Sequence, residues 1–142
     1  MRYLSTFVLC VICISTAALA QNPSGKNADA EAAQAYSLQQ WDRAEHLYSE
    51  LTQTQPANAR YWYRYAVSAR ADKHYDIALK AFDEAKKNGQ GKGLPAFLVD
   101  YEVAATQAAM GHPDDAFTAL KSAIFVFHGR QSILIEAIRR SP

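Results

Sequence analysis

The stretch that decides the fold is residues 61–87, which read YWYRYAVSARADKHYDIALKAFDEAKK. Apolar side chains recur here every three or four residues on both sides of a short polar turn at residues 71–74. The two stripes are Trp62, Tyr65, Ala66 and Ala69 before the turn, and Tyr75, Ala78, Phe82 and Ala85 after it. This spacing places each set on one face of a helix. The stretch therefore predicts two amphipathic helices joined by a tight turn.

The same landmarks recur before and after this stretch. Tyr48 and Phe82 lie 34 residues apart, and so do the residues at the other matching positions of the two units. The next unit follows at 38 residues, with Leu120 in the place of Phe82. The four extra residues fall in the glycine-rich segment 88–95, and a surface loop absorbs such an insertion at little cost. Self-similarity at this period predicts a stack of repeated helix pairs.

We expect six helices in three pairs, followed by a short seventh. Asn27 is the expected N-cap of the first helix, and His128 with Gly129 is the expected end of the sixth. No segment shows the alternation of a strand. The expected helices are residues 28–38, 41–55, 58–70, 75–87, 96–110 and 113–128, with a last helix at 131–139.

This pattern resembles the tetratricopeptide repeat, and the middle unit carries the family's landmarks most completely. The first unit lacks an equivalent of Trp62, and the third has Pro113 where the others have an aromatic residue. The matching residues are Ala32, Trp41, Ala44, Tyr48 and Pro56; Trp62, Ala66, Tyr75, Ala78, Phe82 and Ala85; and Ala104, Gly111, Ala116, Leu120 and Ala123. The resemblance covers residues 25–130. It implies an all-α, right-handed superhelical stack of antiparallel helix pairs.

The resemblance also implies a domain organisation. The repeat domain spans residues 28–140, and its repeats lie at about 25–58, 59–92 and 97–130. The helix at 131–139 would cap the third pair, with an apolar side made of Ile133, Leu134, Ala137 and Ile138.

The N-terminus reads as an export signal. Arg2 precedes an apolar run over residues 7–19, and Ala18-Leu19-Ala20 fits a signal-peptidase site. We therefore expect a signal peptide at 1–20, a flexible leader at 21–27 and a periplasmic or secreted protein. An uncleaved anchor is the alternative, but the run is short for a span of about 20 residues.

Cleavage would leave a mature chain without cysteine, because Cys10 and Cys13 belong to the signal. It would also leave as many acidic as basic residues. Nucleic-acid binders usually carry a basic excess, so we expect no nucleic-acid partner. We also expect no stable membrane insertion once the signal is removed.

In the tetratricopeptide family, ligands usually lie in the concave groove lined by the first helix of each pair. The resemblance places a stripe of the middle unit there, together with one tyrosine from each flanking unit. Arginine can bind a carboxylate through two parallel hydrogen bonds, and tyrosine offers contact area at low entropic cost. Both properties suit the binding of an extended peptide. The alternative is an ordinary solvated helix face. The expected groove residues are Arg60, Tyr63, Arg64, Val67, Arg70, Tyr36 and Tyr101.

The family's clamp for C-terminal carboxylates is not expected here. It needs asparagine and lysine on the inner helices, and Ala33, Val67 and Ala105 stand where the asparagine would be. The histidines, at 46, 74, 112 and 128, fit no local metal-ligand pair. The glycines of segment 88–95 lack the spacing of a phosphate-binding loop.

These observations favour a non-catalytic interaction module, an adaptor or assembly subunit that holds a peptide or partner protein. We expect no cofactor, no metal and no enzymatic activity. Two alternatives remain open. One is a structural envelope protein that self-associates through an exposed face, and the other is an accessory subunit of an enzyme. The sequence leaves the oligomeric state open.

Overall fold

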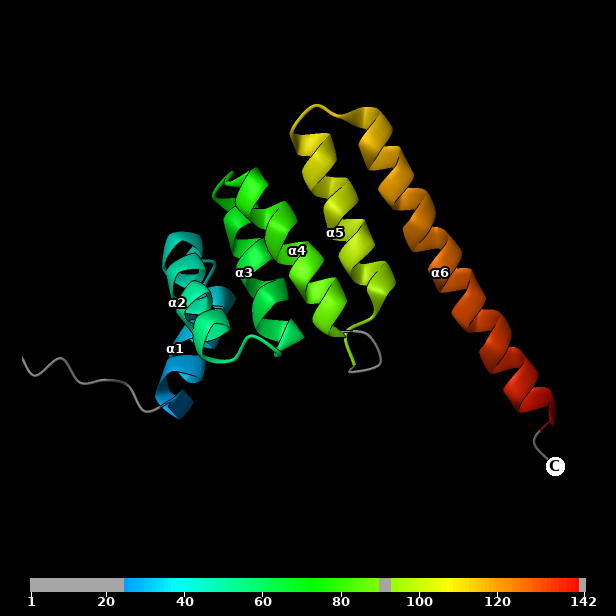
Figure 1. The fold of residues 1–142 in the computed structure, drawn as a ribbon, viewed down its shortest axis with the longest axis horizontal. Coiled ribbons are helices and arrows are strands. Elements are labelled where there is room, and N and C mark those ends of the chain that lie inside the picture. The colour runs from blue at the N-terminus through cyan, green and yellow to red at the C-terminus, as the bar shows by residue number, and fades with distance from the viewer. Residues whose placement is uncertain (1–24, 90–92, 141–142) are drawn as a thin grey trace, which may run out of the picture.

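The computed structural model describes residues 25–89 and 93–140, with side chains for 27–89, 93–129 and 131. Its described residues form six α-helices and no strand (Figure 1). The helices are α1 (Gly25–Ser37), α2 (Trp41–Thr54), α3 (Ala59–Ala71), α4 (Tyr75–Gly89), α5 (Ala96–Ala109) and α6 (Pro113–Arg140). The predicted all-α class is confirmed.

The helices stack in chain order as three antiparallel pairs. α1 packs on α2, α3 on α4 and α5 on α6, while α2 with α3 and α4 with α5 join one pair to the next. Figure 1 shows the pairs side by side, from α1 and α2 to α5 and α6. Because each pair contacts only its neighbours, the architecture is a short solenoid.

Two core clusters fill the space between the pairs. One joins α1, α2 and α3 through Tyr48, Leu51 and Tyr61, and the other joins α3, α4 and α5 through Phe82 and Val99. Alanines occupy the positions where helices touch, and Ala32, Ala44, Ala66, Ala78 and Ala85 are all fully buried. A larger side chain there would overpack the helix contact. The predicted core stripes of the first two units are therefore confirmed at their alanines and at Tyr48, Leu51 and Phe82. The other predicted aromatic residues are half-buried, namely Trp41, Trp62, Tyr65 and Tyr75.

The turn between the helices of each pair has the same backbone shape. Gln39, Lys73 and Gly111 occupy its left-handed position, with φ of 56°, 65° and 81°. The following amide donates a hydrogen bond back into the first helix, as His74 N does to Ala69 O at 2.8 Å. Only the third unit uses glycine, the residue that takes this conformation without steric cost.

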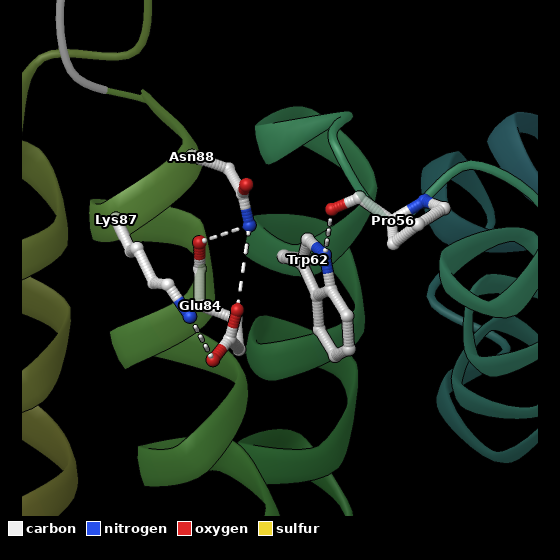
Figure 2. A network of polar contacts seen from close by, with 5 residues as sticks. All are labelled: Pro56, Trp62, Glu84, Lys87 and Asn88. Carbon is white, nitrogen blue, oxygen red and sulfur yellow. Dashed lines mark hydrogen bonds and ion pairs between the residues drawn. The ribbon is translucent and has the colours of Figure 1, made fainter.

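Trp62 fixes the connection between the first two pairs. Its indole Nε1 donates a hydrogen bond to the carbonyl of Pro56 at 2.7 Å, so the turn before α3 is tied to the helix itself (Figure 2). Figure 2 also shows the end of α4, where the side-chain amide of Asn88 donates to the Glu84 carbonyl at 2.9 Å. This contact holds the Asn88 side chain against the last turns of α4.

Helix ends differ from expectation in α1 and α6. α1 begins at Gly25, so Asn27 lies within the helix rather than at its N-cap, and the expected leader does not extend to residue 27. α6 runs through His128 and Gly129 to Arg140, so residues 131–139 continue α6 and the prediction of a separate capping helix is wrong. Glycine inside a helix costs only about 1 kcal/mol, which the flanking helix formers offset.

Two expectations lie outside what the structure describes. The signal peptide at 1–20 and the start of the leader belong to residues 1–24. The inward side of the C-terminal segment also falls outside, because its side chains at Ile133, Leu134, Ala137 and Ile138 are not among those described.

Candidate functional site

The first helices of the pairs, α1, α3 and α5, form one surface that we call the inner face. Glu102 of α5 ties this face together. Its carboxylate accepts a hydrogen bond from the Tyr63 hydroxyl at 3.3 Å and pairs with Arg70 Nη2 at 3.0 Å. Both partners lie on α3, so α3 and α5 are held in a fixed relative position.

Tyr63 is held by packing as well as by this bond. Its ring contacts Phe82 edge-on, with 6.1 Å between the centroids. Burial raises the pKa of the Tyr63 hydroxyl well above its usual value, and the nearby Glu102 carboxylate raises it further. Tyr63 is therefore a neutral hydrogen-bond donor at physiological pH.

Arg64 is positioned by aromatic side chains from the first pair. Its Nη1 donates to the Tyr48 hydroxyl at 2.7 Å, and its guanidinium lies 5.5 Å from the ring centroid of Tyr36. A cation over an aromatic face gains about 0.5 to 2 kcal/mol. No described carboxylate pairs with Arg64. Its charge is therefore fixed in place but not neutralised by an ion pair.

A hollow of about 630 Å³ opens beside Arg64, at the N-terminus of α3. Arg60 and Arg64 lie one turn apart on its wall, and Asn58 caps α3 by accepting from the Arg60 amide at 3.2 Å. The other lining residues are Asp29, Ala33, Ala57, Ala59, Tyr61, Asn88, Gly93 and Leu94. Two guanidinium groups and a helix N-terminus outweigh the one carboxylate, so the hollow favours an anionic group.

The structure separates the seven predicted groove residues into three groups. Arg60 and Arg64 line the hollow, and Tyr36 supports Arg64 from α1. Tyr63 and Arg70 lie on the inner face but are engaged with Glu102. Val67 is buried in the core, and Tyr101 lines a different hollow with residues of α6.

Sequence reasoning missed Asp29 and Glu102. Both are acidic residues on the first helices of flanking pairs, and the repeat contained a signal for one of them. Glu102 follows Arg64 by 38 residues, the spacing that relates the second and third units. Aligning charges as well as apolar residues would have placed a carboxylate beside the α3 arginines.

Two further properties hold for the described part of the chain. No group of three or more histidine, cysteine, aspartate or glutamate side chains there is arranged to hold a metal ion. None of the described helices combines the length and apolar character needed to cross a membrane.

Comparison with known protein families and with curated proteins gives no match. Solved structures do match, among them two of MamA, a protein with a tetratricopeptide-like fold. MamA MSR-1 gives a TM-score of 0.69 at 20% identity, and MamA AMB-1 gives 0.65 at 21%. Each alignment covers 75% of this chain but only 59% and 56% of the MamA chains, respectively. The chain therefore has a tetratricopeptide-like fold, as its sequence repeat predicted.

Proposed function

We propose that this chain is a non-catalytic protein-interaction module whose inner face binds an acidic segment of a partner protein or peptide. The observation that carries the proposal is the hollow at the N-terminus of α3, where Arg60 and Arg64 stand one turn apart on the wall. The MamA-like fold supports a scaffold or assembly role by analogy of architecture.

The two arginines differ in a way that suits recognition. Arg64 is held against Tyr36 and Tyr48, so little rotational freedom is lost when it binds. Arg60 is exposed, and its side chain can adapt to the ligand. A carboxylate accepts two parallel hydrogen bonds from one guanidinium, which fixes its orientation. An aspartate, a glutamate or a terminal carboxylate in an extended peptide fits this chemistry.

Arg70 and Tyr63 have a different part in this proposal. Their contacts with Glu102 fix α3 against α5 and keep the floor of the inner face rigid. A rigid first helix holds Arg60 and Arg64 at a fixed spacing, and such preorganisation raises affinity by lowering the entropy lost on binding.

We also propose that the chain acts in the periplasm or in the medium. The charged start, apolar run and small-residue cleavage motif of residues 1–20 support export to the periplasm or the medium. The partner would then be an exported or envelope protein. No nucleic acid and no cofactor enters the proposed role.

The test is to recover proteins that co-purify with the tagged chain from its native host. Arg60→Glu reverses the charge at an exposed position of the hollow. Arg64→Lys keeps the charge but removes the planar guanidinium that can donate two parallel hydrogen bonds. Lys80→Glu is the matched control, because Lys80 is an exposed residue of α4 outside the hollow. We expect one partner to be lost from both arginine variants and retained by the control. A partner that survives Arg60→Glu and Arg64→Lys refutes the assignment of the hollow.

A further inference from the structure

The hollow at the N-terminus of α3 contains a charge that the binding of an acidic group does not use. Asp29 of α1 is the one carboxylate among its described lining residues, and it shares the hollow with Arg60 and Arg64 of α3. Asp29 is half-buried, so part of its side chain stays accessible. At about 630 Å³ the hollow has the size of a ligand pocket and takes more than one side chain.

The opposite charges of the hollow do not neutralise each other. Burial raises the pKa of the Tyr48 and Tyr61 hydroxyls, Asp29 raises both pKa values further, and Arg64 lowers both. Asp29 and Arg64 therefore lie near the same two hydroxyls. Yet no ion pair joins Asp29 to either arginine of the hollow, or to any other cation among the described side chains.

The tyrosines explain why the two charges stay apart. Arg64 Nη1 donates to the Tyr48 hydroxyl at 2.7 Å, and the Arg64 guanidinium also lies against the Tyr36 ring. Tyr61 keeps its proton at physiological pH, because burial and Asp29 both raise its pKa, so its hydroxyl can donate a hydrogen bond to Asp29. Each charge has a tyrosine partner, and neither is drawn to the other.

A purely acidic ligand would leave Asp29 without a partner. When such a ligand covers the hollow, Asp29 loses water and gains a like charge nearby, and both effects oppose binding. A cation on the ligand removes this cost by pairing with Asp29, while the carboxylate of the ligand pairs with Arg60 or Arg64. A cost imposed on the wrong ligand is one of the two ways in which binding sites achieve specificity.

We propose that the hollow selects a mixed-charge segment, in which a carboxylate contacts the arginines of α3 and a neighbouring cationic group contacts Asp29. Asp29 is then a specificity-determining residue of the site. The inference rests on the proposed function, because it needs Arg60 and Arg64 to bind an acidic group. A lysine or arginine side chain and a free N-terminus are the two sources of such a cation in a peptide.

The proposal is tested by NMR shift titration of the whole chain with short synthetic peptides. The mixed probes carry one glutamate and one lysine, one to four residues apart, in a Gly-Ser background with both ends blocked. The acidic probes have glutamine in place of the lysine. The free-amine probes are acidic probes with an unblocked N-terminus near the glutamate. We expect the best mixed or free-amine probe to bind roughly fivefold more tightly than its acidic counterpart, and the tighter of the two identifies the source of the cation.

Asp29→Asn separates the charge of Asp29 from its structural contact. The variant keeps a carbonyl oxygen that can accept from Tyr61 but removes the negative charge. We expect weaker binding of the mixed probe and tighter binding of the acidic probe, so that the two affinities differ by less than about twofold. A residue that only supports Tyr61 would change both affinities in the same direction or neither. Glu31→Gln is the matched control, because it makes the same charge change on α1 outside the hollow.

The outcomes distinguish this inference from the proposed function. An acidic probe that binds as tightly as every mixed and free-amine probe, yet is weakened by Arg64→Lys, overturns the mixed-charge inference and leaves the acidic-ligand site in place. A preference for mixed charge that persists in Asp29→Asn also overturns the inference. If no probe binds in a manner that depends on Arg64, the acidic-ligand site is refuted and the inference is refuted with it.

Discussion

Arg70 of α3 lies 3.0 Å from Glu102 of α5, and the same carboxylate accepts a hydrogen bond from Tyr63, about two helix turns before Arg70. Both ends of the ion pair are largely shielded from water. The pair therefore holds two first helices together across the inner face, toward the opposite end of α3 from Arg60.

Replacing the Glu102 carboxylate tests both its ion pair with Arg70 and its effect on the pKa of Tyr63. We expect Glu102→Gln to lower the free energy of unfolding by about 1 to 2 kcal/mol, because Arg70 keeps its charge and loses its partner. The pKa of Tyr63 should fall, since Glu102 is one cause of its elevation, yet stay above 10.0 because burial is the larger cause. Absorbance titration of tyrosinate, with Tyr63→Phe to assign the signal, measures the shift. An unchanged pKa of Tyr63 would contradict this contact.

The raised pKa of Tyr63 also makes the free energy of unfolding depend on pH. A tyrosine whose pKa is raised in the folded state stabilises the fold fully below its unfolded pKa of 10.0. That contribution is lost as the pH rises from 10.0 through the folded value. The free energy of unfolding should therefore fall on the alkaline side, and less steeply in Glu102→Gln. Denaturant titrations at a series of alkaline pH values provide the measurement.

His74, in the turn of the second pair, should hold this turn against α2 through its ion pair with Glu45. Its Nδ1 lies 2.9 Å from the Glu45 carboxylate, and that hydrogen bond and charge raise the pKa of His74 above 6.5. The resulting stabilisation is present below pH 6.5 and is lost as the pH rises through the folded pKa. Histidine titration by NMR should show the pKa falling toward 6.5 in Glu45→Gln. Glu50→Gln, which removes the neighbour of His46 instead, should leave His74 unaffected.

Ala78, at a helix contact of the middle unit, should tolerate a charged side chain poorly. Ala78 is 0% exposed, so Ala78→Asp would bury a charge without a partner and cost about 3 kcal/mol or more. Ile77→Asp is the matched control, since the neighbouring Ile77 is 40% exposed. Thermal melting compares them. Equal midpoints for the two variants would show that the repeat stripes are assigned to the wrong faces.

The turns of the second and third pairs share one left-handed position, which is Lys73 in one and Gly111 in the other. Introducing glycine at the first and removing it from the second tests this shared backbone shape. Lys73 has a φ of 65°, so Lys73→Gly should raise the free energy of unfolding by about 0.5 kcal/mol, the relief of steric strain exceeding the added chain entropy. Gly111 holds the equivalent position with a φ of 81° and open space where a Cβ would lie, so only backbone strain opposes a side chain there. Gly111→Ala should therefore lower the free energy of unfolding by about 1 kcal/mol. Chemical denaturation resolves both changes. A lower free energy of unfolding in Lys73→Gly together with a higher one in Gly111→Ala would reject the shared turn geometry.

The sequence predicts the fold well because the helix-pair pattern occurs three times. Most of the aromatic and alanine positions recur at a set spacing, so a helix that is weakly marked in one unit is still indicated by its equivalents in the others. Helix ends are less certain because they depend on small energies. Gly129 resembles a stop signal, yet no proline follows it within α6, the next two residues are the helix formers arginine and glutamine, and the helix continues to Arg140.

The candidate site is harder to predict because it depends on contacts between units. Val67 lies on the predicted groove stripe, but Val99 and Phe82 pack around it and remove it from the surface. Tyr101 lies on the first helix of its pair, yet it lines the hollow between α5 and α6. Glu102 neutralises Arg70 and leaves Arg60 and Arg64 as the available cations. None of these outcomes follows from helical periodicity within one unit.

The most direct test of the central claim is site-specific photo-crosslinking in the native host. A photoreactive residue at position 57, an exposed alanine of the hollow, leaves both arginines in place, and one at position 80 reports on a surface of α4 outside the hollow. The acidic-ligand account predicts a discrete adduct from position 57, its loss when Arg64 is changed to Lys, and no such adduct from position 80. An adduct from position 80 alone, or one from position 57 that is indifferent to Arg64, would contradict it.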